Sequence, residues 1–388
     1  MKNPNDIDRL LSQSIGPRDI PGVVAMAANN EEIVYEAAFG NRLIGDDAAM
    51  TADTVVWIAS MTKAVTAVAA MQLVEKREIN LDEPASQFIQ ELSQVQVLDG
   101  FDRAGAPRLR SPERAITLRH LLTHTSGFSY PMWNADLARF MEIANVPDIS
   151  TCKYASLLTP LIFDPGTRWE YGIGIDWVGR IVETISGQKL GAYMQEQIFS
   201  PLGMASTSFR LTPAQRQKQA GMHARGQDGY LQLTAMEIEQ EPEFEMGGGG
   251  LYSTAQDYIR LTQMLLNEGS LNDNQILQAE TVHLMTQNHI GALDVTAFKT
   301  VAPDLSNDAN FYPEQAQKWG LSFLINTEQT AQGRSSASLA WAGLANTYFW
   351  IDPQKHITGI FLTQILRPSS TLQRYLFFKT LKQPYMPE

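Results

Sequence analysis

The chain has little of several features that define whole classes of protein. Its 388 residues include a single cysteine, Cys152, which excludes an internal disulfide and a cysteine-rich metal site and fits a reducing compartment. No run of lysines or arginines occurs, and 30 basic against 42 acidic residues give a formal net charge of −12. Because phosphate binding needs a clustered basic surface, this charge argues against a nucleic-acid partner.

Long hydrophobic runs are also missing. The longest apolar helical stretch, residues 64–74, is far shorter than the roughly 20 residues that a bilayer requires. Residues 1–9 are polar and acidic and contain no apolar segment of a signal peptide. These absences predict a cytoplasmic protein without a membrane partner. With 44% hydrophobic residues, the chain has ample material for a buried core.

Three catalytic signatures are absent. No Gly-x-Ser-x-Gly sequence occurs, which argues against an α/β-hydrolase. His120 and His124 stand four residues apart, but no glutamate follows His120, so we interpret both as structural rather than as metal ligands. The glycines at 247–250 are not followed by the lysine of a phosphate-binding loop. We therefore expect neither a metal nor an organic cofactor.

The hydrophobic pattern predicts strands near both ends of the chain and mainly helices between them. The strand-like segments are residues 22–28, 33–40, 55–59, 318–325, 338–341, 346–351 and 356–364. Short helices are expected at 7–15 and 368–382, and a nearly all-round buried helix follows residue 63. The pattern indicates a discontinuous α/β domain, residues 1–75 and 205–388, around a helical domain, residues 76–204, with the active site at their interface.

The spacing Ser-x-x-Lys suggests a nucleophile and its base. Residues three apart on a helix lie side by side, so a lysine can take the proton of the serine hydroxyl if its pKa falls. This spacing occurs at Ser60–Lys63, Ser150–Lys153 and Ser186–Lys189. Only Ser60 joins an extended apolar stretch to a buried helix, a setting that holds a nucleophile rigidly and excludes water. The competing interpretation of Ser60 is a plain helix cap.

Several motifs then appear in the order and spacing of the serine β-lactamase-like, or penicillin-recognising, superfamily, which the chain resembles over residues 7–380. They are Ser60-Met61-Thr62-Lys63, His120 through Gly127, Pro165-Gly166 followed by Tyr171, Gly248 through Leu251, and Trp341-Ala342-Gly343. The resemblance is greatest to family VIII carboxylesterases and also extends to class C β-lactamases. It implies a β-lactamase-like two-domain α/β fold, with an antiparallel sheet flanked by helices plus an all-helical domain.

The resemblance also implies roles for individual residues. Tyr171 becomes the second proton-transfer group beside Ser60 and Lys63. The backbone N–H groups of Ser60 and Leu344 become the oxyanion hole. Gly343 lets the substrate approach its strand.

The chain departs from the β-lactamase pattern at two positions. Ile173 stands where Tyr-x-Asn has its asparagine, and Trp341 replaces the lysine of Lys-Thr-Gly. Both changes favour an ester over a β-lactam, because an amide that helps hold the acylamide and a cation that attracts a carboxylate are lost. Tyr130, Met132 and Trp133 are candidates for an apolar substrate pocket.

These observations predict a serine carboxylesterase that hydrolyses short-to-medium acyl esters through an acyl-enzyme at Ser60. The expected partner is a small-molecule ester, and the sequence leaves the oligomeric state open. An acyltransferase or an amide or β-lactam hydrolase on the same site stays open. A non-catalytic binding or scaffold protein that has kept the fold is the alternative from another class.

Overall fold

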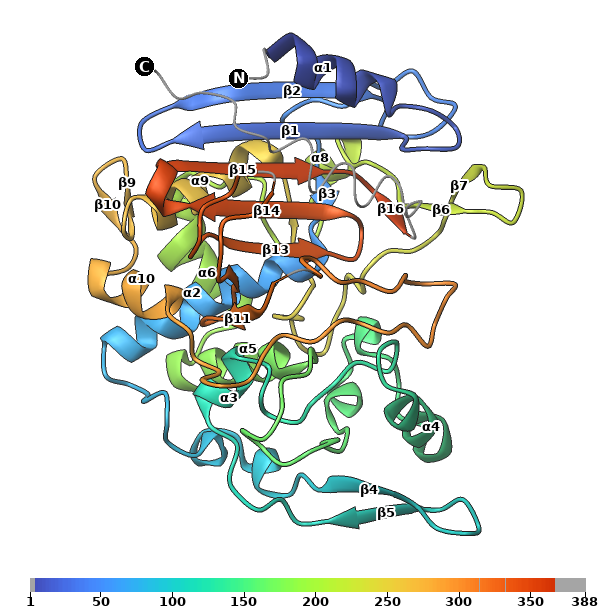
Figure 1. Ribbon diagram of the computed structural model, residues 1–388, viewed down its shortest axis with the longest axis vertical. Helices are drawn as coiled ribbons and strands as arrows, with labels where there is room; N and C mark the ends of the chain where they lie inside the picture. Colours follow the sequence, from blue (N-terminus) through green and yellow to red (C-terminus); the bar gives the residue numbers. More distant parts are fainter. Residues whose placement is uncertain (1–3, 314, 332, 367–388) are drawn as a thin grey trace.

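The fold is built on one antiparallel sheet whose strands come from both ends of the chain (Figure 1). The computed structural model describes residues 4–313, 315–331 and 333–366. The sheet order is β11-β12-β13-β14-β15-β1-β2. The strands are β1 (Gly22–Asn29), β2 (Ile33–Gly40), β11 (Gln317–Trp319), β12 (Leu324–Asn326), β13 (Leu339–Gly343), β14 (Thr347–Asp352) and β15 (Ile357–Leu362).

The strands predicted at 22–28 and 33–40 are confirmed, and they form a hairpin that lies beside β15. β1 pairs with β2 on one side and with β15 on the other, where Val24 lies opposite Leu362. Seven of the eight residues of β1 are buried, because helix α9 (Ala255–Leu266) packs against β1, β14 and β15. The side chain of Thr254 caps α9 by accepting the backbone N–H of Asp257.

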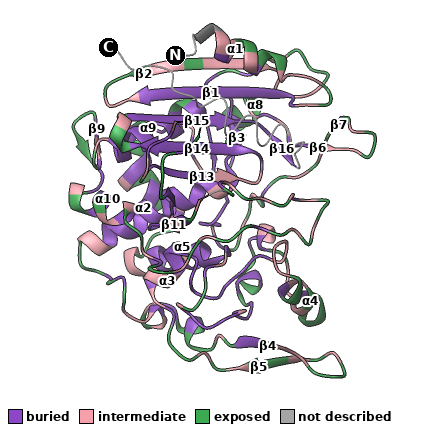
Figure 2. Cartoon of the chain, viewed as in Figure 1, coloured by how far each residue is buried: buried purple, intermediate pink, exposed green. Residues whose placement is uncertain are grey.

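Helix α2 (Thr62–Glu75) is the central helix of the molecule. Twelve of its fourteen residues, Thr62 through Leu73, are buried, which confirms the all-round apolar pattern (Figure 2). It packs against α5 (Gly174–Ser186) and α6 (Leu190–Met194). The helix that carries the candidate base is therefore enclosed on every side.

The remaining helices and strands are shorter than the central sheet and helix α2 or lie outside them. The helices are α1 (Pro4–Gln13), α3 (Leu118–Leu122), α4 (Ala135–Ala144), α7 (Ser200–Leu202), α8 (Pro213–Gln217) and α10 (Ala279–Thr286). The short strands are β3 (Val56–Trp57), β4 (Val97–Phe101), β5 (Pro107–Arg110), β6 (His223–Arg225), β7 (Leu231–Leu233), β8 (Tyr252–Ser253), β9 (Ser270–Leu271), β10 (Asn274–Gln275) and β16 (Ile365–Leu366). Within the described ranges, no helix combines the length and apolar character needed to cross a bilayer.

The structure differs from the sequence predictions in three places. The stretch 318–325 forms two strands, β11 and β12, because the chain reverses where Ser322 adopts a left-handed φ of 80°. The stretch 76–204 is not all helical, since β4 and β5 form a hairpin in it. The strand expected at 55–59 is limited to β3, and a 3-10 turn at Ala59–Met61 leads into α2.

Two sequence predictions stay untested. The helix expected at 368–382 lies outside the described residues. The division into domains at residues 75 and 205 also stays a prediction.

Candidate active site

Ser60 lies in the 3-10 turn that connects β3 to α2. β3 pairs with β8, and the side-chain amide of Gln364 both accepts from the Trp57 N–H and donates to the Trp57 carbonyl, each at 3.0 Å. Ala59, which precedes the serine, has a left-handed φ of 46°. Such a conformation in a residue with a Cβ costs of the order of 1 kcal/mol and is typical of functional sites. The turn therefore holds Ser60 in one orientation at the start of a buried helix, and neither Ser60 nor a neighbouring side chain caps α2.

Lys63 has a side chain with no exposed surface and three hydrogen-bond partners. Its Nζ lies 3.2 Å from Ser60 Oγ, 3.0 Å from the Tyr130 hydroxyl and 2.5 Å from the Gly248 carbonyl oxygen. The carbonyl can only accept, so it orients one N–H of the amine. A neutral amine that donates to Gly248 and Tyr130 keeps one lone pair for the proton of Ser60.

Tyr171 and Trp341 complete the polar part of the site. The indole Nε1 of Trp341 donates to the Tyr171 hydroxyl oxygen at 3.0 Å. An indole N–H can only donate, so the tyrosine keeps its own O–H free for Ser60. Trp341 is thus more than the apolar surface that its sequence suggests, because it also orients the phenol.

Burial determines the protonation states in this cluster. It lowers the pKa of Lys63 to about 7, against a smaller opposing attraction by Asp176. Burial raises the pKa of Tyr171, although hydrogen bonds with Ser60 and Trp341 act in the opposite direction. Burial likewise raises the pKa of Tyr130. Near neutral pH the site therefore offers an amine that can accept a proton and two neutral phenols that can donate one.

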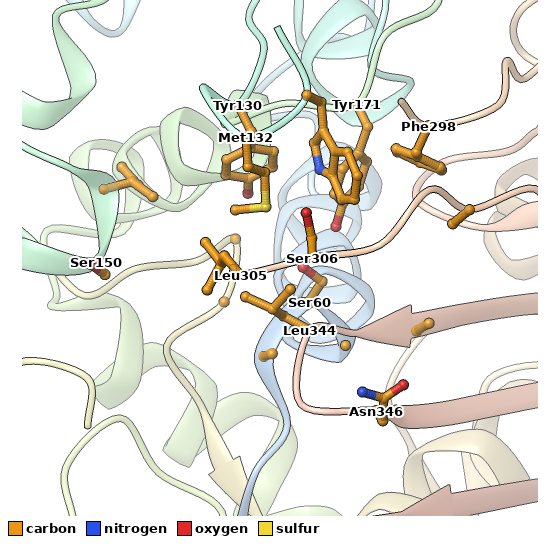
Figure 3. Close-up of a pocket in the computed structure, with 18 of the residues that line it drawn as sticks. Ser60, Tyr130, Met132, Ser150, Tyr171, Phe298, Leu305, Ser306, Leu344 and Asn346 are labelled. Atoms are coloured by element: carbon orange, nitrogen blue, oxygen red, sulfur yellow. The ribbon is translucent and has the colours of Figure 1, made fainter. Parts of the chain in front are cut away.

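A cavity of about 300 Å³ opens in front of Ser60. Figure 3 shows Tyr130, Met132 and Tyr171 above Ser60, with Leu305, Ser306 and Leu344 around it. Three segments that are distant in sequence supply most of its apolar wall. They contribute Met132, Trp133 and Ile149; Met236, Ile238 and Met246; and Phe298, Leu305 and Phe311. The cavity is therefore suited to an apolar organic molecule.

The structure brings every predicted site residue to this cavity except Lys63, which lies behind Ser60. The predicted residues that line the cavity together with Ser60 are Tyr130, Trp133, Tyr171, Trp341, Gly343 and Leu344. Tyr130 does so with its ring and also bonds Lys63 through its hydroxyl, a contact that no sequence pattern indicates.

The end of β13 lies open beside Ser60. β12 pairs with β13 only at Leu339 and Ala340, and the strand then continues to Gly343 next to the turn at Ala59–Met61. A Cβ on Gly343 would lie 2.4 Å from the Ile58 carbonyl oxygen and 3.1 Å from the Ala59 Cβ. The glycine therefore has a packing reason in addition to the substrate approach expected from sequence, because it lets β13 contact the segment that carries the nucleophile.

The other Ser-x-x-Lys pairs have local structural partners. Ser150 Oγ donates to Asp148 Oδ1 at 2.6 Å, and Ser186 Oγ donates to the Val182 carbonyl at 2.7 Å at the end of α5. Among the three serines, Ser60 alone has its hydroxyl within hydrogen-bond distance of the side chain of its lysine.

The two histidines are packed into the structure as the sequence suggests. His120 forms a capping box with Thr117 at the start of α3. His124 lies beyond the end of α3 with its ring centroid 4.6 Å from that of Tyr171. Burial and the charge of Lys63 keep the pKa of His124 well below its usual value. In the described part of the chain, no three His, Cys, Asp or Glu side chains are grouped to hold a metal ion.

Comparison with known proteins identifies the family. The beta-lactamase family model matches residues 7–377. The chain belongs to the beta-lactamase family. It is therefore an enzyme of serine acyl-ester chemistry with a beta-lactamase-like fold.

Individual relatives extend over nearly the whole chain. ML-236A carboxylate methylbutanoyltransferase of Penicillium citrinum is 30% identical over 93% of this chain and 89% of its own length. The lovastatin esterase of Penicillium rubens is 30% identical over 93% of both chains. The unliganded simvastatin synthase of Aspergillus terreus superposes with a TM-score of 0.84 at 29% identity, covering 98% of both chains. The names of these relatives describe a transferase, a synthase and an esterase.

Two features of the site were missed from the sequence. Asp176 is buried beside the Lys63 cluster, yet in sequence it is an ordinary acidic residue in the first turn of a helix. Phe298, Leu305 and Phe311 come from a stretch without regular structure, where no periodicity indicates burial. The only available signal was the density of aromatic residues in an otherwise polar loop.

We expect Gly343→Ala to lower the free energy of unfolding by about 1–3 kcal/mol, since the added Cβ collides with backbone. Urea unfolding measures this change. Gly16→Ala is the control, because a Cβ there would meet only Asp19 Oδ2 at 3.7 Å. A Gly343→Ala protein that is as stable as Gly16→Ala but binds ester poorly would show that this glycine serves substrate approach instead.

We expect Trp341→Phe to reduce kcat for an aryl ester by about five- to tenfold, because one hydrogen bond to the Tyr171 oxygen is lost. Trp133→Phe is the matched comparison. The ring of Trp133 lines the cavity 5.1 Å from that of Phe298, so its shortening should raise KM instead. Steady-state kinetics separates the two effects, and equal kcat values in both variants would contradict an orienting role for Trp341.

Proposed function

We propose that this protein is a serine acyltransferase that moves an acyl group from an ester donor to the hydroxyl of a largely apolar alcohol. The acyl group passes through a covalent intermediate on Ser60. The observation that carries the proposal is the apolar cavity of about 300 Å³ in front of a serine that contacts a buried lysine. Ester hydrolysis is the second candidate function on the same site.

The first half-reaction forms the acyl-enzyme. Lys63 accepts the Ser60 proton, and Oγ attacks the carbonyl carbon of the donor. The backbone N–H groups of Ser60 and Leu344 hold the oxyanion, an interaction worth about 3 kcal/mol for one donor. When the C–O bond to the leaving group breaks, the leaving oxygen takes a proton from the Tyr171 hydroxyl or directly from Lys63. If Tyr171 is the donor, the proton that Lys63 took from Ser60 passes to Tyr171, so that both groups return to their neutral state.

The second half-reaction uses the same groups in reverse. The acceptor hydroxyl gives its proton to the Lys63–Tyr171 pair while its oxygen attacks the acyl carbon. The C–O bond to Ser60 then breaks, and Oγ recovers a proton. When water takes the place of the alcohol, the same steps release a carboxylic acid.

Both the cavity and the relatives favour transfer over hydrolysis as the main activity. An acceptor that fills an apolar cavity displaces the water that would otherwise attack the acyl-enzyme. The methylbutanoyltransferase of Penicillium citrinum and the simvastatin synthase of Aspergillus terreus match nearly the whole chain. The similarity to a lovastatin esterase keeps hydrolysis as the second candidate.

The remaining alternatives have less support. Trp341 and Ile173 stand where β-lactamases use a lysine and an asparagine, and the side chain of Ile173 is 2% exposed and does not line the cavity. An amide or β-lactam substrate therefore lacks its usual contacts. A scaffold without activity is disfavoured by the contacts that Lys63 makes with Ser60, Tyr130 and Gly248.

Product analysis with and without an alcohol distinguishes transfer from hydrolysis. We expect a p-nitrophenyl acyl ester to acylate Ser60, which intact-mass spectrometry detects, and a bulky apolar alcohol to yield more new ester than free acid. Ser60→Ala should lower turnover by at least about 10⁴-fold, as loss of a nucleophile does elsewhere.

Ser186→Ala is the matched control for this experiment, since it removes a serine of the same spacing whose hydroxyl bonds only backbone at the end of α5, donating to the Val182 carbonyl and accepting from the Gln188 N–H. It should behave like the unchanged protein. Free acid as the main product with every alcohol tried would favour the esterase, and full activity of a folded Ser60→Ala protein would exclude both candidates.

The acylation rate should rise with pH and reach half of its maximum near the pKa of Lys63, about 7, because only the neutral amine accepts the serine proton. The burst of p-nitrophenol release, followed as a function of pH, measures this rise. Lys63→Arg keeps the charge but stays protonated, so its rate should be low throughout. A pH-independent rate in the unchanged protein would be incompatible with Lys63 as the base.

A further inference from the structure

Asp176 is a buried carboxylate that the reaction steps above do not use. It lies in the first turn of α5 and has no exposed surface. Its Oδ1 accepts the backbone N–H of Gly248 at 2.8 Å. Its Oδ2 is buried without a hydrogen-bond partner among the described residues. A half-satisfied carboxylate inside a protein costs free energy, so its presence at this place needs an explanation.

Gly248 connects this carboxylate to the candidate base. The residue donates its N–H to Asp176 and accepts from Lys63 Nζ with its carbonyl oxygen. A Cβ on Gly248 would lie 2.4 Å from Asp176 Oδ2, so only glycine fits between them. The position of the carboxylate therefore determines where the carbonyl that orients Lys63 can lie.

The neighbouring residues Gly247 and Gly249 are held by hydrogen bonds that their carbonyl oxygens accept. Thr66 Oγ1 donates to the Gly247 carbonyl at 2.7 Å, and Trp57 Nε1 donates to the Gly249 carbonyl at 2.6 Å. These bonds tie the glycine segment to α2 and β3, whereas Asp176 ties it to α5. The segment has no side chains of its own, so these outside groups hold it in place.

When ionised, Asp176 also supplies negative charge that acts on Lys63, although burial raises the pKa of its carboxyl to about 6 against the opposing attraction of the lysine. Its attraction opposes the effect of burial on the pKa of the amine. The other titratable groups around Lys63 are Tyr130, Tyr171 and His124, and burial keeps the first two neutral by raising each pKa and the third neutral by lowering its pKa. Among the described residues around the amine, Asp176 is thus the one whose charge opposes the effect of burial on the pKa of Lys63.

We infer that Asp176 is a positioning residue for the base: through its hydrogen bond with Gly248 it holds the carbonyl oxygen that orients Lys63 toward Ser60. This inference rests on the proposed role of Lys63 in activating Ser60. A merely structural aspartate at the start of α5 would affect stability but not the pH dependence of Ser60 reactivity.

The test is the rate at which a fluorophosphonate probe labels Ser60 as a function of pH. Labelling needs an activated serine but no acyl acceptor, so it does not depend on whether transfer or hydrolysis is the natural reaction. Asp176→Asn keeps an oxygen for the Gly248 N–H and removes the charge. We expect its half-maximal pH to fall by about one unit, since a neighbouring opposite charge raises the pKa of an amine by that order. The maximal rate should also fall, because the base is weaker.

Asp257→Asn is the matched control. Asp257 is also a buried aspartate in the first turn of a helix, and its Oδ2 accepts the Ser206 N–H at 2.7 Å and bonds Thr207 Oγ1 at 2.9 Å. Unlike Asp176, it bonds neither the glycine segment nor any partner of Lys63, and its charge is not among those that act on the amine, so its replacement should leave the pH dependence unchanged. An equal shift in both variants, or no shift in a folded Asp176→Asn protein, overturns the inference.

Gly248→Ala supplies a second test if Asp176→Asn does not fold. The added Cβ displaces the carboxylate from the glycine segment, so the labelling rate should fall and its half-maximal pH should decrease. Unchanged labelling in this variant overturns the inference. Failure of the unchanged protein to react with the probe at any pH would instead refute the proposed function itself, so the two failures are distinguishable.

Discussion

The burial of the Lys63 amine is the constraint on which the rest of the site depends. A lysine with no exposed surface in the middle of the molecule is unfavourable as a cation and has few polar partners within its own helix. The structure meets this cost with Ser60, Tyr130 and the Gly248 carbonyl. Each partner comes from a different segment, so the position of one amine requires that the turn before α2, the Tyr130 segment and the glycine segment converge. The same burial makes the amine able to act as a base.

Trp341 changes the character of the site at a position where a β-lactamase has a lysine. Its ring lies 4.5 Å from that of Trp319, 4.9 Å from Tyr171 and 5.4 Å from Phe311, measured between centroids. Neither lysine nor arginine occurs in the described lining of the cavity. The loss of a cation removes electrostatic capture of a carboxylate, and the indole N–H takes over the orientation of the phenol. One replacement therefore alters both what the cavity binds and how the tyrosine is held.

The sequence predicts those parts of the structure that depend on local chemistry. The apolar run of α2 and the strands β1 and β2 follow from periodicity and side-chain type, and the ordered motifs locate Ser60, Lys63, Tyr171 and Trp341. Contacts between distant segments are not predictable in this way. The bonds of Tyr130 with Lys63 and of Asp176 with Gly248 join residues 67 and 72 positions apart. Similarly, Ser322 permits a reversal inside a stretch whose alternation is typical of a single strand.

Whether such a site transfers or hydrolyses depends on binding rather than on its catalytic groups, because both acceptors react with the same acyl-enzyme. Water at about 55 M has an advantage of about 5 × 10⁴ over an alcohol at about 1 mM, which corresponds to about 6.5 kcal/mol. At about 0.8 kcal/mol for each buried methylene, an alcohol must bury about eight such groups to compensate. The apolar residues from three segments provide this kind of surface around Ser60. A small alcohol cannot bury enough of it, so acyl transfer on this site requires an acceptor whose apolar body is large compared with its reacting hydroxyl.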